Sequence, residues 1–184
     1  MFKRAVAYLL ILGIFTSCVS VDPEGRGYSV TIPMAIVNST LAQNFPVDRD
    51  LKYGVVSGKL NISNPTIFGQ SGKDKLAVGS QFKFTNVLIP NGISGEIKLD
   101  SGVKYDPVSR NLYLKEPMVQ DVKFQEESLL QKLPDGIKKV IGDIVAKTVA
   151  EKPIYNLKQS NIISGFVRGI DVRSGQIYLT FGLY

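Results

Sequence analysis

The stretch ISGEIKLDSGVKY, from Ile93 to Tyr105, decides the fold, because its apolar and polar residues alternate with a period of two. Successive side chains of a β-strand point to opposite faces of a sheet, so this strand is expected to bury one face and expose the other. Related patterns run from Val56 to Phe124 and are interrupted by turn signals such as Pro90-Asn91-Gly92 and Asp106-Pro107. A series of long antiparallel strands is therefore predicted.

The period changes after Gly136. From Ile137 to Val149 the apolar residues recur at the spacing of one helix face, and the opposite face carries Lys138, Lys139, Asp143 and Lys147. This pattern predicts an amphipathic helix of roughly 16 residues, or about 24 Å. A strand at Tyr28–Ile32 followed by a shorter helix over 33–44 is predicted before the long strands, and two further strands are predicted after Pro153.

This order of elements favours an α+β fold. Helices would cover one face of a strongly curved antiparallel β-sheet, with the long helix in the C-terminal half and the short helix near the N-terminus. The length after residue 26 suits a single domain with its own core.

Cys18 is the only cysteine, and it follows the features of a secretion signal. Lys3 and Arg4 precede an apolar run over 5–15, which is short of the ~20 residues that cross a bilayer. The tetrapeptide FTSC at 15–18 resembles a lipobox, the recognition site of the bacterial lipoprotein signal peptidase. We expect a signal peptide at 1–17, a lipidated tether at 18–26 and one α+β domain at 27–184. An ordinary signal sequence, or a buried cysteine, is the alternative.

Lipidation of Cys18 would anchor the protein stably to a membrane, because two or more acyl chains already suffice. Val19, rather than Asp, follows the cysteine, and this favours the outer membrane, with the domain facing the periplasm. The net charge of +6 comes from dispersed residues. This charge suits an ordinary solvated surface or a position near anionic lipid headgroups. The sequence lacks the interleaved basic and aromatic residues that are typical of nucleic-acid-binding proteins, so no nucleic-acid partner is expected.

The composition argues against an enzyme. The chain has no histidine, so the commonest general base and the commonest metal ligand are missing, and we expect neither a metal nor a cofactor. A Ser-His-Asp or Cys-His arrangement cannot be built. A carboxylate site at Glu116, Asp121 and Glu126-Glu127 is the remaining catalytic alternative, and these residues read more simply as surface charges.

Three segments resemble a known family: Phe45-Pro46, the strand-Pro-strand stretch YLKEPMV at 113–119, and the region from Leu133-Pro134 to PIYNL at 153–157. They are similar to those of the YceB-like bacterial lipoproteins, a family of uncharacterised function. The resemblance implies a long helix cradled by a curved sheet, as in the tubular lipid-binding domains, and it implies no catalytic residue.

Two classes of function remain open. In the first, the apolar faces of strands and helix enclose a groove for a lipid or another hydrophobic ligand. The candidate lining residues are Phe82, Phe84, Ile97, Leu99, Leu114, Ile137, Ile141 and Ile144. The same residues could instead fill a solid core. In the second class, the domain is a non-catalytic adaptor that binds an envelope protein, for instance through an exposed strand edge.

Overall fold

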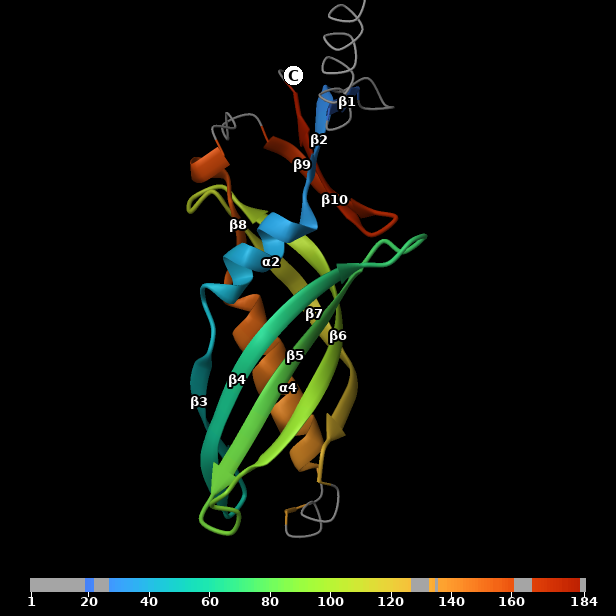
Figure 1. Ribbon diagram of the computed structural model, residues 1–184. Helices are drawn as coiled ribbons and strands as arrows, with labels where there is room; N and C mark the ends of the chain where they lie inside the picture. Colours follow the sequence, from blue (N-terminus) through green and yellow to red (C-terminus); the bar gives the residue numbers. More distant parts are fainter. Residues whose placement is uncertain (1–18, 22–26, 127–132, 135, 161–166, 183–184) are drawn as a thin grey trace, which may run out of the picture.

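The computed structural model describes residues 19–21, 27–126, 133–134, 136–160 and 167–182 of the 184-residue chain. Most of these residues form two antiparallel sheets (Figure 1). The larger sheet has six strands in sequential order: β3 (Val47–Tyr53), β4 (Val56–Gly69), β5 (Leu76–Asn86), β6 (Ile93–Asp106), β7 (Asn111–Phe124) and β8 (Pro153–Asn156).

The smaller sheet joins the two ends of the described chain. Its order is β1-β2-β10-β9, formed by β1 (Val19–Val21), β2 (Tyr28–Ile32), β10 (Gln176–Phe181) and β9 (Val167–Arg173). It lies at one end of the larger sheet (Figure 1), and β9 contacts β6.

Two α-helices and one short 3-10 helix complete the fold. The α-helices are α2 (Met34–Ala42) and α4 (Ile137–Ala150), and the 3-10 helix is η1 (Leu157–Ser160). Helix α4 packs chiefly on β7 and also contacts β3, whereas α2 packs on β4 and β8. No helix of the described residues combines the length and the apolar character that crossing a bilayer requires.

The predicted fold class is wrong. A single sheet wrapped around a long helix was expected, but the structure is mostly β and divides its strands between two sheets. The 14 residues of α4 span about 21 Å, less than half of the roughly 46 Å of a 14-residue strand such as β6. The physical reason is non-local pairing: the first and last strands pair with each other instead of extending the large sheet, and sequence periodicity carries no information about pairing partners.

Several predicted elements are confirmed. Strand β6 buries Ile93, Gly95, Ile97, Leu99, Ser101 and Val103 while Glu96 and Lys98 are exposed, as the alternation predicts. Helix α4 buries Ile137, Ile141, Val145 and Val149 along one face. Strand β10 buries Ile177, Leu179 and Phe181.

Strand β7 departs from a simple alternation, because two bulges shift its phase. Leu114 pairs with Val103, but beyond the first bulge Met118 pairs with Asp100 and Val119 with Leu99. Each extra residue of a bulge reverses the side chains that follow it. A simple alternation continuing from Leu112 and Leu114 predicts a buried Met118, but the bulge leaves Met118 47% exposed. Glu116 at the first bulge has a positive φ of 49°.

Some predictions fall on residues outside the described ranges. These are the signal peptide, Cys18, and Glu127 of the carboxylate alternative. A short helical turn over 126–132 and an inward-pointing Leu183 at the end of the last strand, which the sequence also predicts, lie mostly or wholly outside the described residues. Within the expected tether, Val19–Val21 form β1, which pairs with β2.

Candidate ligand-binding groove

The eight residues predicted to line a ligand groove lie together in the hydrophobic core. Seven are at most 3% exposed, and Ile144 is half-buried. They project from β5, β6, β7 and α4 into the layer between the large sheet and the helix. None of them lines the cavities along the outer side of α4 or the cavity between the two sheets, which are formed by other described residues. Their role in ligand binding stays a prediction.

An open groove follows the other side of α4, where the helix passes the edge of β7. Three neighbouring cavities of about 400, 590 and 430 Å³ share residues, so they form one groove along the helix. The first two share Val119, Lys139 and Asp143, and the last two share Lys147 and Ala150. We call this the α4–β7 groove.

The groove exists because β7 has a free edge. Strand β8 pairs with β7 only at Asn111–Tyr113, and no strand of the described residues pairs with the same edge of β7 beyond Tyr113. Pro117 and the two bulges interrupt the regular backbone of this edge, as in proteins that protect edge strands from aggregation.

The floor of the groove is apolar. Pro117, Met118 and Val119 of β7 line the central cavity together with the small residues Ala146 and Ala150 of α4. Gly142, one turn before Ala146, lets the helix approach closely: a Cβ atom there would lie 3.2 and 3.3 Å from the two Cγ atoms of Val119. Met118 and Val119 nevertheless keep 47% and 37% of their surfaces exposed. Exposed apolar side chains in a concave site are typical of binding grooves.

The rim of the groove carries charges of both signs, with lysines along the helix. Lys139 pairs with Asp143 one turn later, and Lys138 lies over the ring of Phe124, with Nζ 5.8 Å from the ring centroid. Lys147 stands where the central and last cavities meet, and Lys104 of β6 lines the last one. Asp121, Asp143, Asp106 and Glu151 line the same cavities, so the charges along the groove are mixed. A negatively charged group would be placed beside Lys147, which forms no ion pair among the described residues.

A hydrogen-bonded turn closes the end of the groove near Lys104. Ser109 Oγ donates to Asp106 Oδ2 at 2.6 Å, and the backbone N–H of Val108 donates to Asp106 Oδ1 at 3.1 Å. These hydrogen bonds, that of Ser109 foremost, lower the pKa of the Asp106 carboxyl group, with a smaller contribution from nearby Lys104. Asn111 Nδ2 donates to the Tyr113 hydroxyl at 3.3 Å, while Asn111 Oδ1 is buried without a hydrogen-bond partner.

The side of α4 toward β3 is fixed by polar contacts. Arg49 Nε donates to Thr148 Oγ1 at 3.1 Å, and Arg49 Nη2 lies 2.9 Å from Glu151 Oε2. Thr148 is buried, so its hydroxyl needs this partner. Helix α4 is therefore fixed on the β3 side and lines the open groove on the β7 side.

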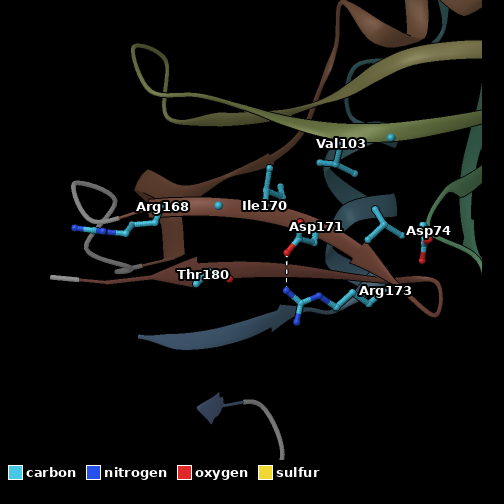
Figure 2. Close-up of a pocket in the computed structure, with 10 residues that line it drawn as sticks. Asp74, Val103, Arg168, Ile170, Asp171, Arg173 and Thr180 are labelled. Atoms are coloured by element: carbon cyan, nitrogen blue, oxygen red, sulfur yellow. Dashed lines mark hydrogen bonds and ion pairs between the residues drawn. The ribbon is translucent and has the colours of Figure 1, made fainter. Parts of the chain in front are cut away.

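A second cavity, of about 810 Å³, lies between the two sheets (Figure 2). Its walls include every residue from Arg168 to Arg173 of β9, together with Gly102 and Val103 of β6, Thr180 of β10 and Asp74. Asp171 and Arg173 pair with each other at 2.7 Å. We call this the inter-sheet cavity.

Sequence reasoning found the strand and helix that form the α4–β7 groove but missed its lining. It placed Lys138, Lys139 and Lys147 on the wet face of the helix, which is correct, and gave them no role. Pro117 and Glu116 in the middle of a strand pattern were the available signal for a bulge. The carboxylate alternative stays a hypothesis: Glu116 and Asp121 lie on β7, Glu126 follows it, and Glu127 lies outside the described residues.

Comparison with known proteins gives one family match. Residues 35–176 match the model of a family described as a protein of unknown function, DUF1439. A comparison with curated proteins found no match. Among solved structures, a crystal structure of lipopolysaccharide binding protein aligns with 80% of this chain and 45% of its own, at 12% identity and a TM-score of 0.26. The chain thus spans less than half of that protein, and a TM-score this low supports no argument about fold or ligand.

Proposed function

We propose that this chain, which belongs to the DUF1439 family of proteins of unknown function, is a lipid-anchored envelope protein that binds an anionic amphiphile in the α4–β7 groove. An amphiphile here means a molecule with an acyl chain and a negatively charged head, such as a fatty acid or a phospholipid. The proposed role is binding and not catalysis.

One observation carries the proposal: exposed apolar residues form the floor of an open groove whose rim carries lysines. Met118 and Val119 would contact the acyl chain, and burying them would remove apolar surface from water. Lys147 forms no ion pair among the described residues, and it can therefore bind a carboxylate or phosphate head. The adjoining cavities run beside a helix of about 21 Å, a shape that suits an extended chain.

The groove replaces the interior as the proposed binding place. In this conformation the layer between the large sheet and α4 is occupied by side chains such as Phe84 and Ile141, both 0% exposed. A ligand reaching that layer would first have to separate α4 from β7. The α4–β7 groove needs no such movement, and it lies between the same sheet and the same helix.

Binding is tested with a fluorescent fatty acid, using the full-length protein. We expect Met118→Ser and Lys147→Glu each to weaken binding about tenfold, which corresponds to about 1.4 kcal/mol. Val87→Ser and Lys59→Glu are matched controls, because both are exposed residues that do not line the groove, and both should bind like the wild type. Equal affinity of all four variants would contradict the proposal.

The anchoring is tested separately at Cys18. Cys18→Ala should abolish labelling with palmitate and block lipoprotein processing. Because Val19 follows the cysteine, we propose that the protein resides in the outer membrane with its domain in the periplasm. Recovery with inner-membrane fractions alone would overturn this location without affecting the groove. The finer assignment to the YceB-like lipoproteins is part of the same proposal.

The non-catalytic adaptor is a second candidate function. The observation that favours it is the edge of β9, which pairs with no strand of the described residues and lies along the inter-sheet cavity.

A further inference from the structure

The inter-sheet cavity runs along β9, the last strand of the small sheet, and reaches over the face of that sheet at Thr180 of β10. Side chains of a strand alternate between its two faces, so a cavity on one face is lined mainly by every second residue. All six residues from Arg168 to Arg173 line this cavity, which places the backbone edge of β9 along it. No strand of the described residues pairs with this edge, since β9 ends the order β1-β2-β10-β9.

Two glycines in the cavity wall leave space that the fold does not use. A Cβ atom at Gly169 would meet nothing closer than Thr180 Cβ at 3.9 Å, and one at Gly102 nothing closer than Lys115 Cβ at 3.6 Å. By contrast, a Cβ at Gly95 of β6 would lie 2.3 Å from the Lys123 carbonyl oxygen, so packing alone requires that glycine. Both glycines adjoin β-bulges, where strand glycines are common, and neither fills the cavity with a side chain.

The charges at the cavity also point to a ligand. Arg168 and Asp74 lie at opposite ends of it (Figure 2), and neither forms an ion pair among the described residues. Between them, Asp171 and Arg173 neutralise each other. An occupant with an acidic group at one end and a basic group at the other would match this pattern, and the pattern would also fix its direction.

We infer that the inter-sheet cavity binds an extended polypeptide segment of a partner protein, which adds a fifth strand to the small sheet beside β9. Main-chain hydrogen bonds to the edge of β9 would provide the affinity, as in other cases of β-strand addition. An acidic residue of the segment would pair with Arg168 and a basic residue with Asp74. Six residues of β9 span about 20 Å, which defines the length of the segment. This inference rests on the adaptor candidate of the proposed function and is independent of amphiphile binding in the α4–β7 groove.

The experiment selects peptides from a displayed library of random heptapeptides against the full-length wild-type protein. Selected peptides are synthesised in two forms, unmodified and N-methylated at alternate backbone nitrogens, and their affinities are measured by fluorescence anisotropy. We expect the selected sequences to carry an acidic residue toward one end and a basic residue toward the other. N-methylation on the edge facing β9 should weaken binding at least tenfold, because it removes the donors that strand addition requires.

Two glycine variants locate the binding. A Cβ atom at residue 169 has room, with Thr180 Cβ at 3.9 Å, so Gly169→Val should fold like the wild type. Its branched side chain in the cavity wall should weaken peptide binding at least tenfold. Gly79→Val is the matched control, because that strand glycine also has room, with Phe68 Cε2 at 3.8 Å, and does not line the cavity. Arg168→Glu should weaken binding of the same peptides.

Three results would overturn the inference: no peptide is selected, selected peptides bind Gly169→Val and the wild type equally, or N-methylation has no effect. Fatty-acid binding measured on the same variants should stay unchanged. A loss of both activities in Gly169→Val would mean that the fold, and not the cavity, was altered, and would also count against the inference.

Discussion

The two faces of helix α4 differ in how completely they are covered. Toward the large sheet, Ile137, Ile141 and Val149 are almost fully buried, and the layer is filled with side chains. Toward the free edge of β7, Met118 and Val119 stay partly exposed beside lysines. The same helix therefore contributes stability with one face and a candidate binding surface with the other. The difference arises in β7, whose bulges and missing partner strand leave one side of the helix uncovered.

The largest effect is expected on the buried face. Ile141→Ala should lower the free energy of unfolding by about 2–5 kcal/mol, because it leaves a cavity in a packed layer. Ile141→Asn should cost a further ~1–3 kcal/mol for the unsatisfied amide and leave the domain largely unfolded. Urea denaturation followed by circular dichroism measures both. If Ile141→Asn folds with nearly wild-type stability, water reaches this layer, and the contrast between the two faces fails.

A smaller loss is expected where α4 is fixed to β3. Arg49→Ala removes the hydrogen-bond donor to the buried Thr148 hydroxyl and should lower the free energy of unfolding by about 1–3 kcal/mol. Glu151→Ala breaks only the partly exposed ion pair with Arg49 and should cost less than about 1 kcal/mol. Thermal unfolding of the two variants gives the comparison. Equal losses would mean that the ion pair, rather than the Thr148 contact, fixes the helix.

On the groove face, a substitution should change binding more than stability. Ala150 lines both the central and the last cavity, so Ala150→Phe would fill the place where they join. We expect the free energy of unfolding to change by less than about 0.5 kcal/mol, as for surface sites away from special features. Fatty-acid affinity should fall about tenfold. Ala42→Phe, at an exposed position of α2, serves as the control. Unchanged affinity for Ala150→Phe would show that the ligand does not cross this junction.

The smallest effect is expected at the turn that closes the groove. Hydrogen bonds from Ser109 and Val108 lower the pKa of Asp106, so the folded state favours the ionised carboxylate. The resulting stability is present above the pKa of the unfolded chain and is lost as the pH falls through the lowered pKa of the folded state. Ser109→Ala should raise the pKa of Asp106, and Ser109→Thr should retain the hydroxyl and most of the effect. NMR titration of the Asp106 carboxyl carbon measures the pKa. If the pKa of Asp106 is the same in both variants, the backbone N–H of Val108, and not the Ser109 hydroxyl, is the main cause of the lowered pKa.

The sequence predicted most elements of the fold because periodicity depends on local geometry. The alternation from Ile93 to Tyr105 gave β6, and the spacing from Ile137 to Val149 gave α4, since each pattern matches one repeat of the backbone. The eight predicted lining residues are all apolar and, with the exception of half-buried Ile144, fully buried. A pattern of burial, however, does not distinguish a packed core from the wall of a ligand site.

By itself, the sequence of this chain determined most strands, both α-helices and the apolar faces of β6 and α4, while β1 and β3 were not predicted. Tertiary structure alone decided three further features. The terminal strands pair into a separate sheet, the bulges at Glu116-Pro117 and Gln120 move Val119 rather than Met118 toward α4, and β7 and β9 keep free edges. Each depends on contacts between residues far apart in the chain, whose pairing follows from the packing of the whole domain and leaves no local periodic signal.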